Sequence, residues 1–310
     1  MKIVIIDDLN LEQDQIKVLR RLSHFKIYND KPTENQIIKR ISNANIVVTN
    51  TTKITKKTIY SAPHLIMIAA AATGAELIVD LKAAAQKNIT VTNVPGYATE
   101  SVAELTFGLI FNLSRKILSA DKSIRQGNNN YKPFLGQELK GKTLGIIGLG
   151  KIGKKVSQLA LAFEMKVIAN DIKPQKEIEI KMVNLKSLLK KSDIVTIHCD
   201  LNPRSKKLLG IKELSLMKTS ALLINTAREE IIDEKALLIV LEQKKIAGLG
   251  LEFNILRNNL QTHPFLQLEN TVLTPHIGFF TKEALSLRKQ IVFENIINFL
   301  KGNPQNIFKL

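Results

Sequence analysis

Three glycines and one carboxylate in the middle of the chain have the spacing of a dinucleotide-binding site. Gly148, Gly150 and Gly153 follow a short apolar stretch that is typical of a buried strand, and a helical pattern begins directly after the second glycine. The first glycine permits a tight turn, the second lets the backbone approach a pyrophosphate, and the third lets the helix pack closely on the strand. Asp171 comes 18 residues after the last glycine. Its carboxylate suits an adenosine ribose and repels a 2′-phosphate, so the pattern predicts that NAD binds in preference to NADP.

The helix that is predicted over residues 151–163 adds positive potential to this site. The first N–H groups of a helix have no partner within the helix, and the aligned peptide dipoles make that end partly positive. We therefore expect Lys151 and Ile152, which open the helix, to bind the cofactor phosphates. Lys173 is a weak signal for NADP, but a solvated loop lysine is the simpler interpretation.

Two further side chains stand directly after predicted strands and suit anion and proton chemistry. Arg228 follows the apolar stretch 221–227, and ligands of open α/β sheets gather at the carboxyl ends of strands. Its planar guanidinium binds a carboxylate in a bidentate manner, although spacing alone also allows a surface ion pair. His276 follows the stretch 271–274, and imidazole gives and takes a proton near neutrality. An isolated histidine is more often structural, so position alone leaves both interpretations open.

The elements that must position these residues alternate between strands and helices. In the first hundred residues we predict strands over 2–7, 25–28, 45–49, 65–71 and 90–93. The helices predicted between them cover 11–22, 33–41, 56–61 and 79–87. After residue 141 the predicted strands cover 143–147, 166–171, 194–199, 221–227, 248–253 and 271–274. Such alternation of apolar strands with helices indicates parallel sheets that are covered on both faces.

Two longer helices complete the predicted elements. One covers 101–126, where Ser101 and Glu104 have the form of a capping box. The other covers 281–300 near the end of the chain, and this late position lets it return to the first domain.

The composition limits the classes of protein that fit. With 310 residues, of which 45% are hydrophobic, the chain is long enough for two domains of ordinary size. No apolar run approaches the roughly 20 residues that span a bilayer, and the N-terminus has no signal-peptide pattern, so no membrane association is expected. The single cysteine, Cys199, excludes an internal disulfide framework and favours a cytoplasmic location. No metal site is expected either.

The formal net charge of +17 needs a separate explanation. The lysines are dispersed, and the densest group, Lys53, Lys56 and Lys57, contains no aromatic side chain on which a base could stack. We therefore expect no specific nucleic-acid partner. The positive charge is more economically explained as steering acidic substrates and cofactors toward the site.

Four segments together resemble the D-isomer-specific 2-hydroxyacid dehydrogenase family, and in particular its glycerate and phosphoglycerate dehydrogenase-like members. The segments are Val-Pro-Gly-Tyr at 94–97 with Ser-Val-Ala-Glu at 101–104, the glycine run 148–153, Asn-Thr-Ala-Arg at 225–228 with Ile-Asp-Glu at 232–234, and Thr-Pro-His-Ile-Gly at 274–278. They occur in the order and spacing of the family over nearly the whole chain. The resemblance implies hydride transfer between NAD(H) and a small 2-oxo or D-2-hydroxy acid, with a hydroxypyruvate- or glyoxylate-like substrate.

The same resemblance implies a fold and an assembly. The fold class is α/β, with two doubly wound parallel-sheet domains. A Rossmann NAD-binding domain, residues 101–280, is inserted into a discontinuous, flavodoxin-like substrate-binding domain, residues 1–100 and 281–310. Members of the family are commonly homodimers, with the long helix after the first crossover in the interface, so a homodimer is expected.

The resemblance also implies roles for individual residues. Arg228 matches the substrate-binding and catalytic arginine of the family, and His276 matches its acid–base histidine. The backbone around Thr73 and Gly74 matches the loop that binds the substrate carboxylate. The remaining cofactor-binding candidates are His198, Thr226, Ala227 and Glu252. His198 is more simply interpreted as a packing residue near the site, and Glu252 stands where relatives usually carry an aspartate near the nicotinamide.

One position departs from the family pattern. The glutamate that normally pairs with the histidine comes five residues after the acid near the nicotinamide, and counting from Glu252 gives Arg257. An arginine beside His276 would lower the pKa of the imidazole. Glu252 is therefore a candidate substitute in catalysis. The alternative is an NAD(H)-binding regulatory or interaction protein with weakened or lost catalysis. The turn 74–80 is also one residue longer than usual and lacks the usual asparagine.

Overall fold

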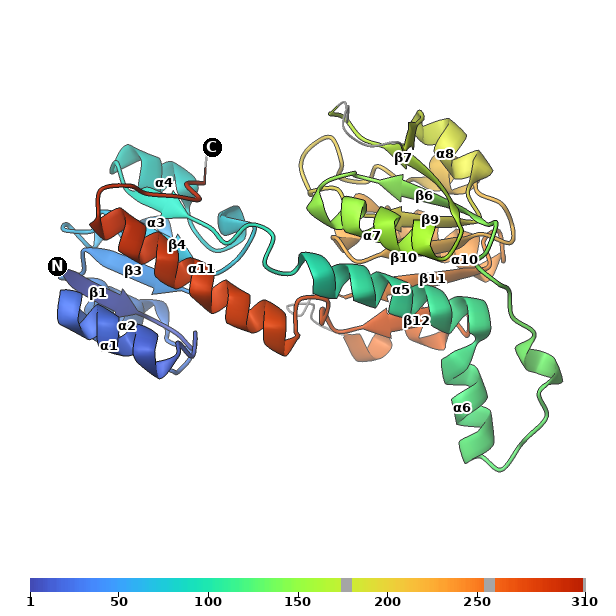
Figure 1. Ribbon diagram of the computed structural model, residues 1–310, viewed down its shortest axis with the longest axis horizontal. Helices are drawn as coiled ribbons and strands as arrows, with labels where there is room; N and C mark the ends of the chain where they lie inside the picture. Colours follow the sequence, from blue (N-terminus) through green and yellow to red (C-terminus); the bar gives the residue numbers. More distant parts are fainter. Residues whose placement is uncertain (174–179, 254–259, 309–310) are drawn as a thin grey trace. The chain divides into compact units, whose positions relative to one another are not determined.

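The computed structural model describes residues 1–173, 180–253 and 260–308. The chain forms two units (Figure 1). Unit 1 comprises Met1–Tyr97 and Thr281–Leu310, and unit 2 comprises Ala98–Phe280. Arg257 and the other residues of 254–259 lie outside the described residues. No helix within the described ranges is long and apolar enough to cross a membrane.

Unit 1 is a parallel five-stranded sheet with helices on both faces. The strand order is β2-β1-β3-β4-β5, with bounds β1 (Lys2–Ile5), β2 (His24–Ile27), β3 (Ile46–Thr49), β4 (Met67–Ala70) and β5 (Thr90–Thr92). The helices are α1 (Gln13–Leu22), α2 (Glu34–Ile41), α3 (Lys56–Tyr60), η1 (Ala75–Leu77), α4 (Leu81–Gln86) and α11 (Lys282–Leu300). This is the flavodoxin-like order, in which the direction of winding reverses between β1 and β3.

Both faces of this sheet are buried, which explains why its strands are apolar at nearly every position. One core cluster joins alternate strand residues such as Val4 and Ile68 to α2, α3 and α4. The other joins Ile3 and Ile5 to α1 and to Val292 of α11. Neighbouring side chains of a strand point to opposite faces of the sheet. The residues that contact α11, the helix predicted over 281–300, therefore lie on the face opposite to those that contact α2–α4 (Figure 1).

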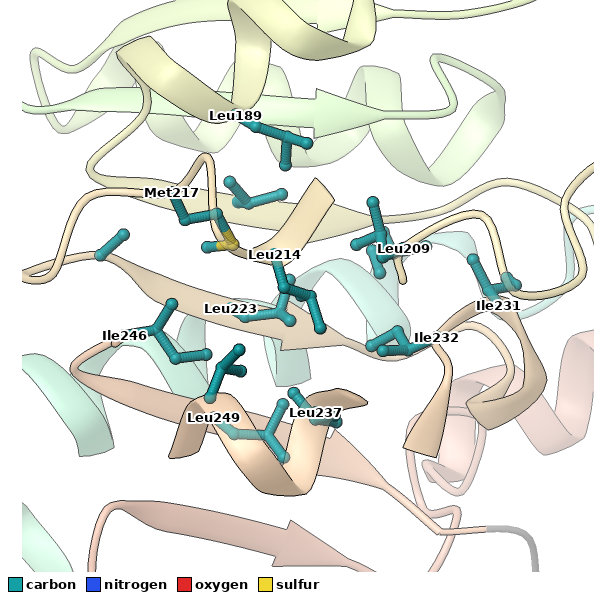
Figure 2. Close-up of a cluster of buried hydrophobic side chains, with 14 of the residues drawn as sticks. Leu189, Leu209, Leu214, Met217, Leu223, Ile231, Ile232, Leu237, Ile246 and Leu249 are labelled. Carbon is teal, nitrogen blue, oxygen red and sulfur yellow. The ribbon is translucent and has the colours of Figure 1, made fainter. Parts of the chain in front are cut away.

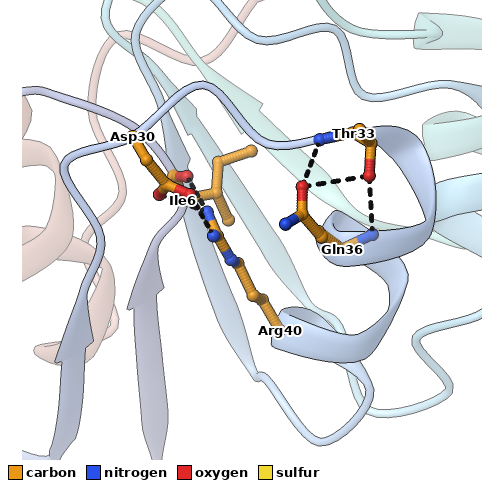
Figure 3. Close-up of polar contacts among 5 residues, drawn as sticks. All are labelled: Ile6, Asp30, Thr33, Gln36 and Arg40. Atoms are coloured by element: carbon orange, nitrogen blue, oxygen red, sulfur yellow. Dashed lines mark hydrogen bonds and ion pairs between the residues drawn. The ribbon is translucent and has the colours of Figure 1, made fainter.

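Local polar contacts define the start of α2 and attach it to the sheet (Figure 3). The Gln36 side chain accepts from the Thr33 backbone N–H at 2.8 Å, and the Thr33 hydroxyl accepts from the Gln36 N–H at 3.4 Å, which is a capping box. Near the other end, Arg40 binds Asp30 through two hydrogen bonds of 2.8 and 2.5 Å and donates to the Ile6 carbonyl at 3.0 Å. These hydrogen bonds from Arg40 hold the pKa of the Asp30 carboxyl below its usual value.

Unit 2 is a parallel seven-stranded sheet in the Rossmann order. The order is β12-β11-β10-β9-β6-β7-β8, with bounds β6 (Thr143–Ile147), β7 (Lys166–Asn170), β8 (Lys181–Met182), β9 (Ile194–Ile197), β10 (Leu222–Asn225), β11 (Gly248–Glu252) and β12 (Thr271–Thr274). The α-helices are α5 (Thr99–Arg115), α6 (Ile117–Arg125), α7 (Lys151–Ala162), α8 (Leu185–Lys191), α9 (Ile211–Leu214) and α10 (Glu234–Glu242). Short 3₁₀ turns lie at η2 (Lys132–Phe134), η3 (Glu229–Ile231), η4 (Leu260–Thr262) and η5 (Pro264–Gln267).

The largest apolar cluster of unit 2 lies between its sheet and helices α8–α10 (Figure 2). Leu223 and Leu249 of the strands meet Leu189, Leu214 and Leu237 of the helices there. Full burial of a leucine side chain stabilises the fold by about 1.5–3 kcal/mol. On the opposite face, α5 and α7 pack against the sheet. This packing on both faces keeps the carboxyl edge of the sheet in a fixed geometry.

The helix predicted over residues 101–126 differs from the structure in two ways. It is broken at Lys116, whose backbone adopts the left-handed conformation with φ of 53°, so that α5 and α6 are separate helices. It also begins earlier, at Thr99, with Ala98 at the N-cap. Ser101 therefore lies inside α5 and donates to the Ala98 carbonyl at 3.2 Å. The capping box predicted at Ser101 and Glu104 is wrong, because the chain enters the helix before these residues.

Candidate active site

The predicted site residues of unit 2 lie at the carboxyl ends of neighbouring strands. Gly148 follows β6, His198 follows β9, Arg228 follows β10, and Glu252 ends β11. His276 follows β12. Because all of these strands are parallel and adjacent in the order, the residues gather along one edge of one sheet. The winding reverses between β6 and β9, which is where dinucleotides bind in such sheets.

The glycine run has the geometry that a bound dinucleotide requires. Gly148 has a φ of +92°, and a Cβ atom there would lie 2.5 Å from the Cys199 nitrogen. A Cβ at Gly153 would lie 2.2 Å from the Gly148 carbonyl oxygen. A Cβ at Gly150, the N-cap of α7, would meet no atom within 4 Å. The outer glycines are therefore required by the fold, whereas Gly150 leaves open space beside the helix N-terminus that a phosphate could fill.

Asp171 lies beside this loop, as the sequence predicts. One carboxylate oxygen accepts from the Leu149 N–H at 2.6 Å, and the other accepts from the Lys173 N–H at 2.8 Å. The carboxylate is thus oriented by the glycine loop itself. Lys151 is exposed and Ile152 half-buried at the start of α7, so their backbone N–H groups belong to the first turn, which lacks partners within the helix.

His198 follows β9 and is a half-buried residue whose two ring nitrogens are buried. Neither ring nitrogen has a hydrogen-bond partner in the part of the chain that the structure describes. Burial lowers the pKa of His198 to about 3, because the charged form is poorly solvated. An imidazole with this pKa remains neutral near pH 7 and is unsuited to acid catalysis. The structure therefore agrees with a packing role beside the glycine loop.

The turn that presents Arg228 is built by Asn225. The Asn225 side chain accepts from the Ala227 N–H at 3.0 Å and donates to the Arg228 carbonyl at 2.8 Å. Thr226 is buried, and its hydroxyl lies 3.2 Å from that of Thr106. The Arg228 guanidinium donates to the Ala227 carbonyl at 2.8 Å, and no carboxylate of the described ranges forms an ion pair with it. The surface ion pair considered for Arg228 is therefore absent there.

Glu252 positions the loop of His276 rather than the imidazole itself. One carboxylate oxygen accepts from the Gly278 N–H at 2.8 Å and from the Thr274 hydroxyl at 3.4 Å. These contacts hold both sides of His276, whose φ of 54° is unusual for a residue with a side chain. Burial raises the pKa of Glu252, while the hydrogen bonds of the loop and the charge of Arg228 oppose the rise. Among the described residues, no hydrogen bond joins Glu252 to the imidazole.

The pKa of His276 lies below its ordinary value. Burial is the larger cause, and the positive charge of Arg228 is the second. The sequence also predicts a lowered pKa for His276, but it attributes the lowering to Arg257, which lies outside the described residues. Arg228 therefore lies close enough to His276 and Glu252 to affect the pKa of both at this edge of the sheet.

Thr73 and Gly74 lie in unit 1, in the segment that follows β4. Thr73 is exposed and Gly74 is half-buried at the start of η1. No hydrogen bond within the described ranges uses the backbone N–H of Thr73, Gly74 or Ala75 as donor. Three adjacent N–H groups without partners are suited to an anion, and this agrees with the role that the resemblance gives to the loop.

The sequence did not identify the residues that hold the loops at the carboxyl ends of the strands in place. Asn225 was visible only as part of a motif, and its two hydrogen bonds across the turn required the structure. Asp7, two residues after β1, is buried and accepts from the N–H groups of Asn50, Thr51 and Thr52 at 2.8–2.9 Å. The only signal in the sequence was an acidic residue directly after an apolar strand.

Comparison with known proteins identifies the family of the chain. The family described as D-isomer specific 2-hydroxyacid dehydrogenase, NAD binding domain, matches residues 107–278. A glycerate dehydrogenase from Methylorubrum extorquens is 35% identical over 316 residues, which cover 99% of this chain and 98% of that protein. A D-3-phosphoglycerate dehydrogenase from Methanocaldococcus jannaschii is 36% identical over 308 residues, which cover 97% of this chain but only 58% of that protein.

A solved structure has the same fold over the full length. An acyclic imino acid reductase (Bsp5), in complex with NADPH and D-Arg, superposes with a TM-score of 0.92 and 36% identity, and the match covers 100% of both chains. The chain belongs to the D-isomer-specific 2-hydroxyacid dehydrogenase family, a family of NAD-linked oxidoreductases, and unit 2 carries its NAD-binding domain. The predicted family and fold class are confirmed.

Proposed function

We propose that the protein is an NAD-dependent dehydrogenase that reduces a small 2-oxo acid to the D-2-hydroxy acid. The observation that carries the proposal is the group formed by Arg228, His276 and Glu252 on the same sheet edge as the glycine loop. This edge of the sheet thus carries a guanidinium that can bind an anion, an imidazole that can titrate, and a glycine loop that can bind a dinucleotide. The reduction of a 2-oxo acid needs these three functions together.

Each of these groups has a separate role in the reaction. Arg228 binds the substrate carboxylate through its planar guanidinium and fixes the orientation of the 2-oxo group. Within unit 1, the Thr73–Gly74 loop offers backbone N–H groups that suit a substrate carboxylate. NADH, when bound, would supply the hydride for the reduction. His276, as imidazolium, donates its proton to the carbonyl oxygen, and the neutral imidazole that remains is the base for the reverse reaction.

We propose that Glu252 acts as a positioning residue in this reaction. Its hydrogen bonds to Gly278 and Thr274 hold the segment on both sides of His276. It thereby fixes where the imidazole can deliver its proton. The dinucleotide is held by Gly148, Gly150 and Gly153 with the first turn of α7, beside His198, Thr226 and Ala227, and Asp171 binds the adenosine ribose. In this proposal unit 2 carries the NAD-binding residues together with Arg228 and His276.

The proposed substrates are hydroxypyruvate and glyoxylate. The name of the glycerate dehydrogenase that shares 35% identity over nearly its whole length supports a substrate of this size. The test is NADH oxidation with glyoxylate, hydroxypyruvate, pyruvate and bulkier 2-oxo acids. A parallel series adds ammonium, because one solved relative is named an acyclic imino acid reductase. Tight NADH binding with no turnover in either series would refute the proposal and favour the non-catalytic alternative.

We also propose a homodimer in which α6 and the segment after it meet a second copy of the chain. This region exposes large apolar side chains, with exposed fractions of 56% for Leu118, 61% for Ile124, 80% for Tyr131 and 85% for Leu135. A group of this kind on a soluble surface marks an interaction site. Light scattering should give the mass of a dimer, and Leu118→Glu with Leu135→Glu should give that of a monomer. A wild-type monomer would refute this assembly.

A cytoplasmic location is proposed on chemical grounds. The chain has one cysteine, so it forms no disulfide within itself, as is usual for proteins of the reducing cytoplasm. Cell fractionation with an antibody against the protein tests the location.

A further inference from the structure

The loop of Thr73 and Gly74 is fixed by a side chain that the reaction does not otherwise use. Asn93 follows β5, the strand next to β4, and its side-chain amide donates to the Thr73 carbonyl at 2.6 Å. The group that faces a carbonyl oxygen must be the amide nitrogen, because a carbonyl only accepts. The neighbouring Val94 N–H donates to the Ala72 carbonyl at 3.2 Å, and the Thr73 hydroxyl donates to the Val94 carbonyl at 3.4 Å. Three hydrogen bonds thus join residues 72–73 to residues 93–94.

The hydrogen bond at Thr73 acts directly on the N–H of Gly74. The Thr73 carbonyl and the Gly74 N–H belong to one planar peptide unit, in which they point in opposite directions. Fixing the carbonyl therefore fixes the direction of the N–H. A hydrogen bond accepted at the carbonyl also polarises the peptide and makes its N–H a better donor. That N–H is one of the three without a partner among the described residues, so it is available to an anion.

Asn93 is itself held by the C-terminal segment. Its backbone N–H donates to the Asn306 carbonyl at 3.0 Å, and its backbone carbonyl accepts from the Asn295 side chain at 2.8 Å. Asn295, on α11, is only 1% exposed and accepts from the Asn306 side chain at 2.8 Å. A buried amide with several hydrogen bonds defines the position of its neighbours closely. Residues 93, 295 and 306 form a continuous polar chain that ends at the Thr73 carbonyl.

We propose that Asn93 is a positioning residue for the substrate carboxylate, and that Asn295 and Asn306 support it. The inference rests on the proposed function, since it assumes that the Thr73–Gly74 loop binds a 2-oxo acid. Its consequence is specific: loss of the Asn93 amide disorients the Gly74 N–H without removing a group that touches the reacting atoms. Substrate binding is weakened, whereas proton delivery by His276 and binding of the dinucleotide to unit 2 are not.

The test compares Asn93→Ala with a matched control in the same unit. Asn45, before β3, also donates its side-chain amide to a backbone carbonyl, that of His64 at 3.1 Å, and accepts from the Lys2 N–H at 2.8 Å. It lies at the opposite end of the strands, so Asn45→Ala removes similar hydrogen bonds and leaves the carboxyl edge unchanged. Both variants are assayed with glyoxylate and hydroxypyruvate, and oxamate binding to the NADH complex is measured by NADH fluorescence.

For Asn93→Ala we expect KM for the 2-oxo acid and Kd for oxamate to rise about tenfold, as for loss of one well-oriented hydrogen bond to a charged group. We expect kcat and Kd for NADH to stay within about twofold, because the groups that transfer hydride and proton are unchanged. Asn295→Ala should raise KM in the same direction by a smaller factor. Asn45→Ala should lower the melting temperature without raising KM or Kd for oxamate.

Several outcomes would overturn the inference. An equal rise in KM for Asn93→Ala and Asn45→Ala would show a general loss of stability, and a fall in kcat at unchanged KM would place the effect elsewhere. If Asn93→Ala does not fold, Asn93→Ser is measured instead, because its hydroxyl ends one bond earlier and does not reach the Thr73 carbonyl. A wild-type protein with neither turnover nor oxamate binding would refute the proposed function and, with it, this inference. Wild-type activity with an insensitive Asn93 would refute only the inference.

Discussion

The carboxyl edges of the two sheets are organised by different means. In unit 2 the glycine loop is defined by shape: Gly148 has a positive φ, and added Cβ atoms at Gly148 and Gly153 would collide with backbone atoms. In unit 1 the loop of Thr73 is defined by hydrogen bonds from Asn93 and, through it, from Asn295. The steric constraint at Gly153 comes from Gly148 in the same run, and the one at Gly148 comes from Cys199, shortly after β9. The two hydrogen bonds join positions 20 and 202 residues apart.

This difference has a functional reason. A pyrophosphate carries its negative charge on several oxygens, and a loop built from glycines and a helix N-terminus binds it with few other requirements. A small carboxylate substrate requires N–H groups in a definite direction, and a surface loop keeps that direction only if side chains from other elements hold it. Substitutions at the two edges should therefore change different properties of the protein.

The largest effect is expected at His276, the acid of the unit 2 edge. His276→Ala removes the proton donor and should lower kcat by about 10²–10⁴. NADH binding should change little, because the glycine loop follows β6, whereas His276 follows β12 at the end of the sheet. Stopped-flow fluorescence separates the two quantities. His64→Ala is the control, since His64 lies in unit 1 before β4, and a comparable loss of kcat there would contradict the assignment.

The second-largest effect is expected from substitution of Arg228. Arg228→Lys keeps the charge but loses the bidentate geometry, so kcat/KM for the 2-oxo acid should fall by about 10–10² while Kd for NADH is unchanged. Steady-state kinetics and NADH titration test this expectation. Equal losses of cofactor and substrate affinity would instead identify a structural arginine. The comparison with Asn93→Ala is informative, because only Arg228→Lys should lower kcat together with substrate affinity.

Two glycine variants test whether the glycine loop is defined by steric constraints, because one glycine lies in a crowded place and the other in an open one. Gly148→Ala places a Cβ 2.5 Å from the Cys199 nitrogen at a φ of +92°, so it should lower the free energy of unfolding by about 1–3 kcal/mol. Gly150→Ala meets open space, so stability should be kept while NADH affinity falls about tenfold, because the added methyl group occupies the place of a phosphate. Thermal unfolding with and without NADH distinguishes them. Unchanged NADH affinity in Gly150→Ala would place the pyrophosphate elsewhere.

Asp171 should have a smaller effect on affinity and a clear effect on cofactor choice. Asp171→Ala removes the acceptor for the ribose hydroxyls and the repulsion of a 2′-phosphate, so NADH affinity should fall severalfold, by about one hydrogen bond, while NADPH affinity rises. It also frees the Leu149 N–H. Titration with both cofactors is the measurement. A wild-type preference for NADPH would contradict this interpretation of Asp171.

The smallest change is expected in the pH profile. Because burial and Arg228 lower the pKa of His276, the protonated form needed for reduction is lost as pH rises through a value below the ordinary one. We therefore expect kcat/KM for reduction to fall with rising pH from the acid side of neutrality, and the rate of oxidation to rise. Arg257→Glu should move the fall to higher pH. An unchanged profile would show that Arg257 does not act on the imidazole.

The sequence determined much of unit 2 by itself. The glycines, the apolar strands and Asp171 are local signals, because their residue types and spacing can be recognised within one short segment of the chain. The order of the motifs also gave the family, and with it the doubly wound parallel sheets. Arg228 and His276 could be chosen because they directly follow strands, and the carboxyl ends of parallel strands lie on one edge.

Only the tertiary structure decided how these residues are held. That Glu252 binds the loop of His276, that Arg228 lowers the pKa of the imidazole, and that Asn93 reaches the Thr73 carbonyl all depend on distances between segments far apart in sequence. The break at Lys116 was also invisible, since one residue in the left-handed conformation leaves the helical pattern intact. Periodicity reports which face of an element is buried. The partner of a polar side chain is set by the packing of whole elements, for which a single sequence carries no local signal.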